Sequence, residues 1–376
     1  MILSLLMTAA AEEPTFTPEV QVRPRFEADT GEDGAAGGER FFVVQRSRLG
    51  GRAVLGPVTV RAVLQDSRVW GSEADPGKVT AEDLDLRIAS AKLTLGDGAA
   101  LTIGRQEIRW HEQRLIAIAN WQPVGRVFDA ALLDIEQGAF HLQYFGAITA
   151  EGDADAYEEE GLSTGGVAGL EGESTLLDAI YLYDADGNLG RTRHTAGVYA
   201  TIEQGIFAAR VEGYLQRGSI DDATISTAML AVNASVAPAV AGKPKITLWY
   251  DYLSGDDDLT DDQDTAFVMV YGAKHKFMGI ADIVYYQLGG PTDGQGLHNP
   301  ALKLKLAPAD GLVLHLDAHT FLAATDTAAI GNEVDLKAVY ALTDGVKLSA
   351  GSGVFLGAND RPADLFSWLT LDAKFN

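Results

Sequence analysis

Residues 104–138 read GRQEIRWHEQRLIAIANWQPVGRVFDAALLDIEQG, and this stretch decides how the rest of the chain is interpreted. An apolar, β-prone segment precedes it at residues 101–104. Residues 105–126 carry charges, aromatic side chains and a proline, which is the composition of a loop. Extended character returns at residues 128–136 and ends at the turn signal Gln137-Gly138. The stretch therefore predicts a strand end, a long loop and a second strand.

The same pattern continues along the chain in both directions. Segments of about 10 residues alternate apolar with polar side chains, and short connections alternate with long ones. We therefore predict an all-β fold, a transmembrane antiparallel up-and-down β-barrel of about 18 strands. The predicted strands lie near residues 17–28, 40–55, 57–70, 82–96, 100–109, 126–136, 138–149, 163–170, 174–184, 190–203, 205–217, 223–237, 242–254, 296–308, 311–322, 329–342, 345–356 and 364–376.

The alternation can be followed side chain by side chain in the later strands. Leu302, Leu304 and Leu306 share one face of a predicted strand, and Lys303 and Lys305 lie on the other. A soluble sandwich would bury the apolar face, whereas a membrane barrel turns it to lipid. The many strands with a charged second face, and the lack of a helical stretch, favour the barrel.

The composition excludes several classes of protein. The 376 residues are 22% charged and 47% hydrophobic, so the chain is neither disordered nor a helical membrane protein. No window of about 18 consecutive apolar residues occurs, and no membrane-spanning helix is expected. The chain lacks cysteine, which is usual in proteins that cross an oxidising periplasm without disulfides. The net charge of -24 repels nucleic acid, so no nucleic-acid partner is expected.

The opening stretch resembles the alginate export family of bacterial outer-membrane β-barrels. In that family a GRQ motif ends one strand, a tryptophan-containing loop follows, and an F-D-G/A segment starts the next strand. The resemblance implies a channel in the bacterial outer membrane. It also places residues 265–288, which read as a further hairpin by themselves, in a long extracellular loop. The matching positions in this chain are Gly104, Arg105, Gln106, Trp121, Arg126, Phe128, Asp129 and Ala130.

The first residues, MILSLLMTAAA, indicate the end of a secretory signal. A short apolar run, Ile2 to Met7, precedes small residues that offer a cleavage site before Glu12. We expect residues 1–11 to be a signal-peptide remnant and residues 12–376 to be the outer-membrane β-barrel domain. The alternative is an ordinary buried N-terminus, because the basic segment of a signal peptide is missing.

Relatives in this family pass a polyuronate through an arginine-rich constriction, so the resemblance implies basic residues along the pore. A guanidinium binds a carboxylate bidentately, and a ring of weak sites lets a polyanion move from one site to the next. The alternative is that these cations pair with carboxylates of the lumen and do nothing more. The candidate pore-lining and substrate-binding residues are Arg46, Arg48, Arg87, Arg105, Arg109, Arg126, Lys303, Lys305, Lys337, His315 and His319.

Two further patterns could bind metal ions. His315, Asp317 and His319 have the i, i+2, i+4 spacing that can chelate a metal, but this run is not specific and polar filling of the lumen is the preferred interpretation. Acidic clusters at 256–264 and 184–188 could bind calcium or bridge cations to lipopolysaccharide phosphates. Solvated acidic loops are the preferred interpretation of both, and no metal site is predicted.

We predict an outer-membrane channel for passive passage of an anionic polysaccharide or other anionic solute through a basic lumen. Its expected partners are that solute, outer-membrane lipids, lipopolysaccharide and periplasmic export machinery. A general porin, or a porin for uptake of small anions, is the first alternative. A non-conducting barrel, acting as an outer-membrane enzyme or a surface structural protein, is the alternative from another class. The sequence holds no G-x-S-x-G, P-loop, H-E-x-x-H or dinucleotide fingerprint, so neither an enzyme nor a cofactor is expected.

Overall fold

The computed structural model describes residues 13–30, 40–72, 84–150, 161–284, 294–359 and 361–375. The predicted signal-peptide remnant, residues 1–11, lies outside the described residues. No helix in these ranges is long and apolar enough to cross a membrane.

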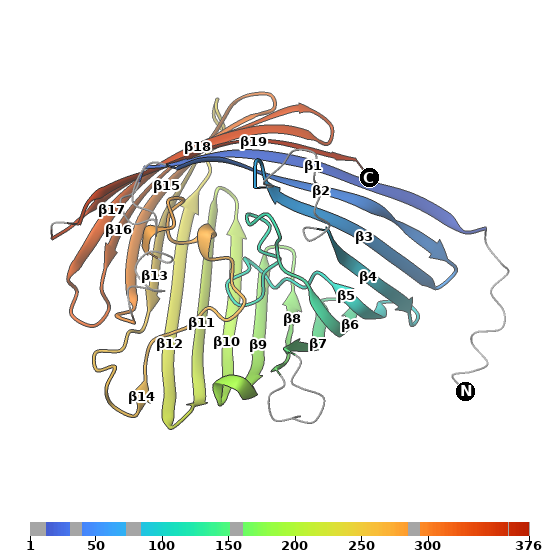
Figure 1. Ribbon diagram of the computed structural model, residues 1–376, viewed down its shortest axis with the longest axis horizontal. Coiled ribbons are helices and arrows are strands. Elements are labelled where there is room, and N and C mark those ends of the chain that lie inside the picture. Colours follow the sequence, from blue (N-terminus) through green and yellow to red (C-terminus); the bar gives the residue numbers. More distant parts are fainter. Residues whose placement is uncertain are drawn as a thin grey trace.

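The wall is a closed antiparallel barrel of 18 strands (Figure 1). It closes where β1 pairs with β19, for example Phe26 with Leu369. The wall strands are β1 Thr15–Asp29, β2 Arg40–Leu55, β3 Val58–Val69, β4 Leu84–Thr94, β5 Ala99–Gln106, β6 Phe128–Gln137, β7 Phe140–Ala150, β8 Gly161–Glu171, β9 Thr175–Asp186, β10 Arg191–Gln204, β11 Phe207–Ile220, β12 Ala223–Val236, β13 Lys245–Leu253, β15 Leu297–Ala309, β16 Leu312–Leu322, β17 Ala329–Thr343, β18 Val346–Gly357 and β19 Ala363–Phe375.

The predicted barrel and its strand number are confirmed. Every predicted strand overlaps an observed one, including the glycine-rich β8. The described part of the doubtful stretch, residues 265–284, contains no strand; it holds the 3₁₀ helix η5, Lys274–Lys276, an isolated β-bridge at Tyr271 and π-helical residues at 283–284. Outside the wall, the two-residue strand β14, Gln263–Asp264, pairs in parallel with β12, and the 3₁₀ helix η4, Gly187–Leu189, joins β9 to β10.

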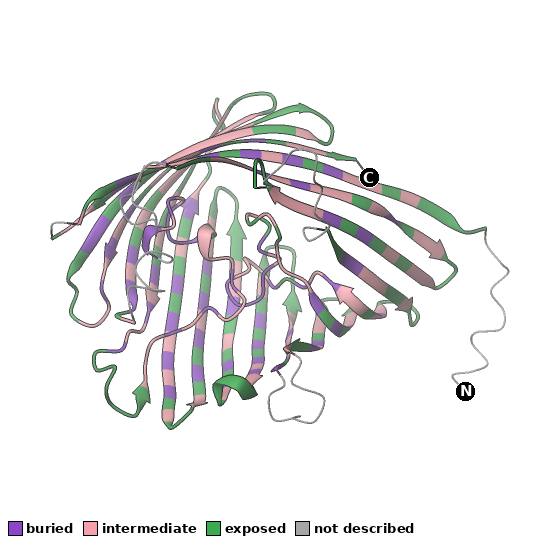
Figure 2. Cartoon of the chain, viewed as in Figure 1, coloured by how far each residue is buried: buried purple, intermediate pink, exposed green. Residues whose placement is uncertain are grey.

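The two faces of the wall have opposite character. Along β19, Leu365, Leu369 and Leu371 point outward and are exposed, whereas Trp368 and Thr370 point inward and are buried. Figure 2 shows the resulting alternation of buried and exposed residues along most strands. An apolar outer face and a polar inner face are the pattern of a barrel that is surrounded by lipid.

The two rims of the barrel differ as predicted. One rim, the turn rim, carries tight connections such as Gly56-Pro57 and Gly345, and both described chain ends reach it. The other rim, the loop rim, carries the long connections. Bacterial barrels place short turns on the periplasmic side and long loops outside the cell, so the turn rim is periplasmic.

Candidate functional site

Two loops fold back from the loop rim into the barrel. The first interior loop, residues 107–127, joins β5 to β6, and the second, described over residues 254–284 and 294–296, lies between β13 and β15. Figure 1 shows both of them, coloured teal and orange, on the concave side of the wall. The backbone N–H of Tyr271 donates to the carbonyl of Leu115 at 3.0 Å, so the two loops also hold each other.

Apolar side chains fix both loops inside the barrel. Ile108, Trp110, Phe267, Met269 and Phe277 are almost completely buried and belong to one hydrophobic cluster with inward-facing residues of the wall. Irregular backbone at membrane depth is tolerated only where protein surrounds it or it lines a cavity. The wall supplies the other half of this packing through inward-facing apolar residues such as Phe145 of β7 and Leu182 of β9.

Arg114 makes the most deeply buried ion pairs of the first interior loop. Its Nε donates to Oε2 of Glu212 on β11 at 3.1 Å, and its Nη2 donates to Oδ1 of Asp251 on β13 at 2.8 Å. All three side chains are at most 1% exposed. The guanidinium also lies 3.9 Å above the ring of Phe277 in the second loop. Arg114 therefore ties the wall and both loops together.

Arginines on the opposite side of the barrel hold the same loop by its carbonyl groups. Arg23 Nη1 donates to the carbonyl of Asn120 at 2.6 Å, and Arg46 Nη2 donates to the Asn120 side chain at 2.9 Å. Arg87 Nη1 donates to the carbonyl of Val124 at 2.7 Å. Arg46 and Arg87 are only 1% and 2% exposed. These two predicted pore residues face the lumen, but the loop covers them.

Trp121 is stacked inside the barrel, next to the wall strands β1 and β19. The guanidinium of Arg25 lies 3.8 Å from one of its rings, and His275 of the second loop stacks on it at 4.0 Å and 8°. Trp368 of β19 meets it edge-on at 5.2 Å. Asp282 binds Nδ1 of His275 at 2.7 Å. The two loops and the wall therefore converge on one indole.

A cavity of about 430 Å³ lies between these loops and the wall formed by β16 to β19 and β1. A second cavity of about 270 Å³ adjoins it between the two loops. The cavities share Asn120, Trp121, His275 and Lys276, so these residues form the boundary between them. The charged residues that line the larger cavity are Arg23, Arg25, Lys276, Lys337 and Lys347 against Asp317, Asp335 and Asp372. We call these two adjoining cavities the passage, and we take the passage and its boundary as the candidate site.

Lys274 gives the smaller cavity a charge that depends on pH. Burial, followed by the nearby charge of Arg126, lowers the pKa of Lys274 from its ordinary 10.5 to about 8. The folded protein therefore loses this proton as pH rises through about 8, while an unfolded chain keeps it. The docked loop should therefore become more stable relative to the unfolded chain as the pH rises from about 8 to 10.5. The cavity should lose one positive charge as the pH rises through about 8.

We therefore expect the anion-to-cation permeability ratio of the channel to fall when the pH is raised from about 7 to about 9. Reversal potentials in a salt gradient, measured at both pH values, check this. Lys274→Met should remove that part of the pH dependence and should resemble the wild type at the higher pH. An identical pH dependence in the wild type and the variant would contradict the assignment to Lys274.

The predicted lysines face the lumen. Lys303 lies 3.4 Å from Asp317 and 4.8 Å from the ring of Trp249, Lys305 is exposed, and Lys337 lines the larger cavity. Arg48 also faces inward, where its Nε donates to Gln65 at 2.7 Å. The location of these side chains agrees with the prediction, and their role in transport stays a prediction.

The prediction for Arg105 is wrong. Arg105 points outward with Ile103, where its guanidinium pairs with Asp129 at 2.8 Å and with Asp85 at 3.3 Å. Its neighbour Gln106 is the residue that points inward, and its amide donates to the carbonyl of Ala130 at 3.0 Å. Because side chains alternate along a strand, only one member of this pair can face the lumen.

The four other predicted pore residues have local partners or line cavities. Arg126 is a loop residue and donates to the carbonyl of Tyr271. His319 is 3% exposed and binds Asn299 at 2.9 Å, so it lies beneath the second loop and does not line the passage. His315 lines the larger cavity, and Arg109 lines a separate one. Within the described ranges, no three His, Cys, Asp or Glu side chains converge in a way that could hold a metal ion.

Sequence reasoning missed six basic residues of the site. Arg23 and Arg25 alternate with the outward-facing Val22 and Phe26, so the period of two could have identified them. Nothing in the strand pattern distinguishes the loop residues, because the path of a loop is not periodic. The missed basic residues are Arg23, Arg25, Arg114, Lys274, Lys276 and Lys347.

Comparisons with known proteins agree with this architecture. The family model described as alginate export matches residues 15–358. No curated protein sequence matches the chain. Three solved structures from Pseudomonas aeruginosa are similar to it. They are OpdK with vanillate (TM-score 0.64, 12% identity, 95% of this chain and 98% of that chain), OpdQ (0.65, 12%, 96% and 98%) and OccK9, also called OpdG (0.66, 13%, 96% and 98%).

At such low identity the solved structures show the shared fold alone. The family match covers most of the chain and adds the biological setting, a channel in the bacterial outer membrane. The wall of 18 strands, its apolar outer face and its narrowed lumen fit that setting. The chain belongs to the alginate export family of outer-membrane β-barrels.

Proposed function

We propose that this channel passes anionic solutes passively and that basic residues of its lumen set the preference. The supporting observation is a row of side chains across four neighbouring strands of the inner wall. Lys245 of β13 lies directly opposite Lys305 of β15, Lys305 lies opposite His315 of β16, and His315 lies opposite Lys337 of β17. We call these four residues the basic row.

The basic row is costly for the fold. Like charges placed directly opposite each other in a sheet are destabilising, and the Lys245–Lys305 pair is such a case. Places where a sequence violates a folding rule are often functional sites. A solute that carries carboxylates would relieve the repulsion as it passes, and a series of weak cationic sites would let it leave again.

The basic row lies toward the periplasmic rim. Lys245 begins β13 and Lys305 is close to the turn at Gly311, and both are exposed. The net charge of -24 does not oppose the proposal, because charges on a confined wall act locally. At physiological salt the Debye length is about 8 Å, so more distant carboxylates are largely screened.

The size of the passage favours small solutes. With both loops docked, the larger cavity measures about 430 Å³, which is the size of a site for a small ligand. A polyuronate would have to thread through the boundary at Trp121 one unit at a time, and this is the second candidate. Both solutes would use the same lysines, so block by alginate compared with block by a single uronate distinguishes them.

A triple variant, Lys245→Gln, Lys305→Gln and Lys337→Gln, tests the function. We expect the anion-to-cation permeability ratio to fall by about tenfold, because a focused field raises the local concentration of counter-ions by at least this factor. Reversal potentials across planar bilayers give the ratio. A wild-type channel that prefers cations would refute the proposal.

The matched control removes the same number of charges from the outer face. The control uses three arginines whose side chains point outward: Arg68 of β3, Arg105 of β5 and Arg217 of β11. Their replacement by glutamine changes the net charge as much as the triple lysine variant does. The permeability ratio of this control should equal that of the wild type, and an equal fall in both variants would show that the basic row has no special role.

A further inference from the structure

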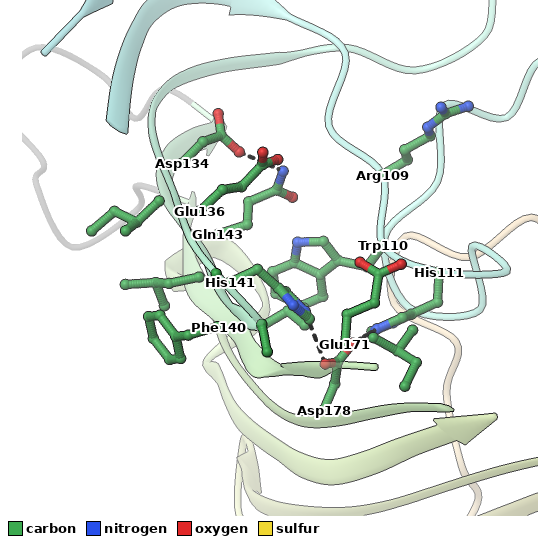
Figure 3. Close-up of a pocket in the computed structure, with 16 residues that line it drawn as sticks. Arg109, Trp110, His111, Asp134, Glu136, Phe140, His141, Gln143, Glu171 and Asp178 are labelled. Carbon is green, nitrogen blue, oxygen red and sulfur yellow. Dashed lines mark hydrogen bonds and ion pairs between the residues drawn. The ribbon is translucent and has the colours of Figure 1, made fainter. Parts of the chain in front are cut away.

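A third cavity, of about 370 Å³, lies apart from the passage (Figure 3). It shares no lining residue with the two cavities at Trp121. Its wall comes from β6, β7, β8 and β9 near the periplasmic rim, and Trp110 and His111 of the first interior loop cover it. Its volume falls within the range of sites for small molecules.

Trp110 presents an unsatisfied donor to this cavity. The side chain is 4% exposed, and its Nε1 has no hydrogen-bond partner among the residues that the structure describes. In Figure 3 the indole nitrogen is on the side of the cavity where Gln143 and Glu136 lie. A buried N–H without a partner costs free energy, so such a group calls for an acceptor.

Gln143 presents the complementary group. Its Nε2 donates to Asp134 at 2.9 Å, which fixes the orientation of the amide, while its buried Oε1 has no partner within the described ranges. Trp110 Nε1 and Gln143 Oε1 therefore offer a donor and an acceptor to a ligand, and among the described lining residues His141 Nδ1 is also without a hydrogen-bond partner. A hydroxyl group satisfies both kinds, because it donates one hydrogen bond and accepts others.

The charges of the cavity argue against an anionic ligand. Asp134, Glu136, Glu171 and Asp178 line it, against the single Arg109. Asp178 is 1% exposed and lies between two histidines, with His111 Nε2 at 2.5 Å and His141 Nε2 at 2.9 Å. A carboxylate ligand would meet several carboxylates here. An ammonium ligand would suit the carboxylates but would leave the Trp110 donor unpaired.

We propose that this cavity binds an uncharged, hydroxyl-rich solute of about the size of one sugar ring. The carboxylates accept hydroxyl protons, and the Trp110 N–H donates to a hydroxyl oxygen. The site is separate from the anion passage, and it does not depend on the anion preference proposed above.

Isothermal titration calorimetry on the full chain tests the proposal. The protein is kept in a detergent without a sugar headgroup, and glucose, glucuronate and 1,4-diaminobutane are titrated separately. Glucose should bind, and the other two should bind more weakly or not at all. Preferred binding of glucuronate or of the diamine would overturn the proposal, and so would the absence of any heat with all three, which would mean that the cavity holds only water.

Two variants locate the binding. Trp110→Phe keeps an aromatic ring but removes the N–H, and Gln143→Met removes the acceptor at similar size. Each should weaken glucose binding by about three- to tenfold, the effect of losing one hydrogen bond. Either variant alone suffices if the other does not fold, as judged by its β-sheet circular dichroism.

Trp249→Phe is the matched control. The Nε1 of Trp249 is also buried and without a partner among the described residues, but Trp249 lies on β13, outside the cavity. This variant should bind glucose as the wild type does. Unchanged binding in both Trp110→Phe and Gln143→Met would overturn the proposal, as would an equal loss in Trp249→Phe.

Discussion

Replacing Arg114 with alanine should release the first interior loop and lower the free energy of unfolding by about 3–5 kcal/mol. The variant would leave Glu212 and Asp251 buried without their shared cation, and an unpaired buried charge is far more costly than the loss of an exposed ion pair. Chemical denaturation of the refolded protein in detergent measures the change. Limited trypsin digestion should also show new cleavage after Arg109 and Arg126, because both lie in the released loop.

Two controls separate this effect from a general loss of positive charge. Arg105→Gln removes an outward-facing arginine that also has two carboxylate neighbours, and it should change the stability by less than about 1 kcal/mol. Arg114→Met combined with Glu212→Gln and Asp251→Asn removes the whole buried charge group and should recover much of the loss. Equal stability of Arg114→Ala and the wild type would show that the buried ion pairs do not hold the loop.

Replacing Trp121 with alanine should open the boundary between the two cavities of the passage. The variant loses the stacking of Arg25 and of His275, together worth about 1–2 kcal/mol, or a factor of about 5–30 in the ratio of closed to open loops. We expect higher single-channel conductance and larger current fluctuations than in the wild type. Single-channel recordings in planar bilayers measure both.

Trp70 provides the control for this prediction. It is 57% exposed on the outer side of the barrel, where its Nε1 donates to Gln45 at 3.1 Å. Trp70→Ala should leave the conductance unchanged. If Trp121→Ala conducts like the wild type, the narrow point of the passage lies elsewhere.

The wall of the barrel could be predicted from the sequence because each strand carries its own signal. Leu302 and Leu304 alternate with Lys303, and turns such as Asp344-Gly345 mark the ends of strands. The same rule could have corrected the error at Arg105. Ile103 is outward-facing and apolar, and a residue two positions later must share its face.

The candidate site could be predicted only in part, because it depends on how two loops fold into the lumen. Period two indicates that Arg46 faces inward, but it does not indicate that the amide of Asn120 will cover it. Arg114 is a loop residue with no periodic neighbours, and its partners Glu212 and Asp251 lie about a hundred residues away or more. Contacts at such sequence separation leave no local pattern.

The contacts of Trp121 also indicate the stage of assembly at which the pore becomes narrow. Arg25 belongs to the first strand and Trp368 to the last, and these two strands form the seam that closes the barrel. The indole finds both neighbours only after the seam has formed, so narrowing of the pore is a late step of assembly. A barrel that has not completed this step would leave an open pore in the outer membrane. Weakening of the seam would therefore raise the permeability of the membrane before it unfolds the protein.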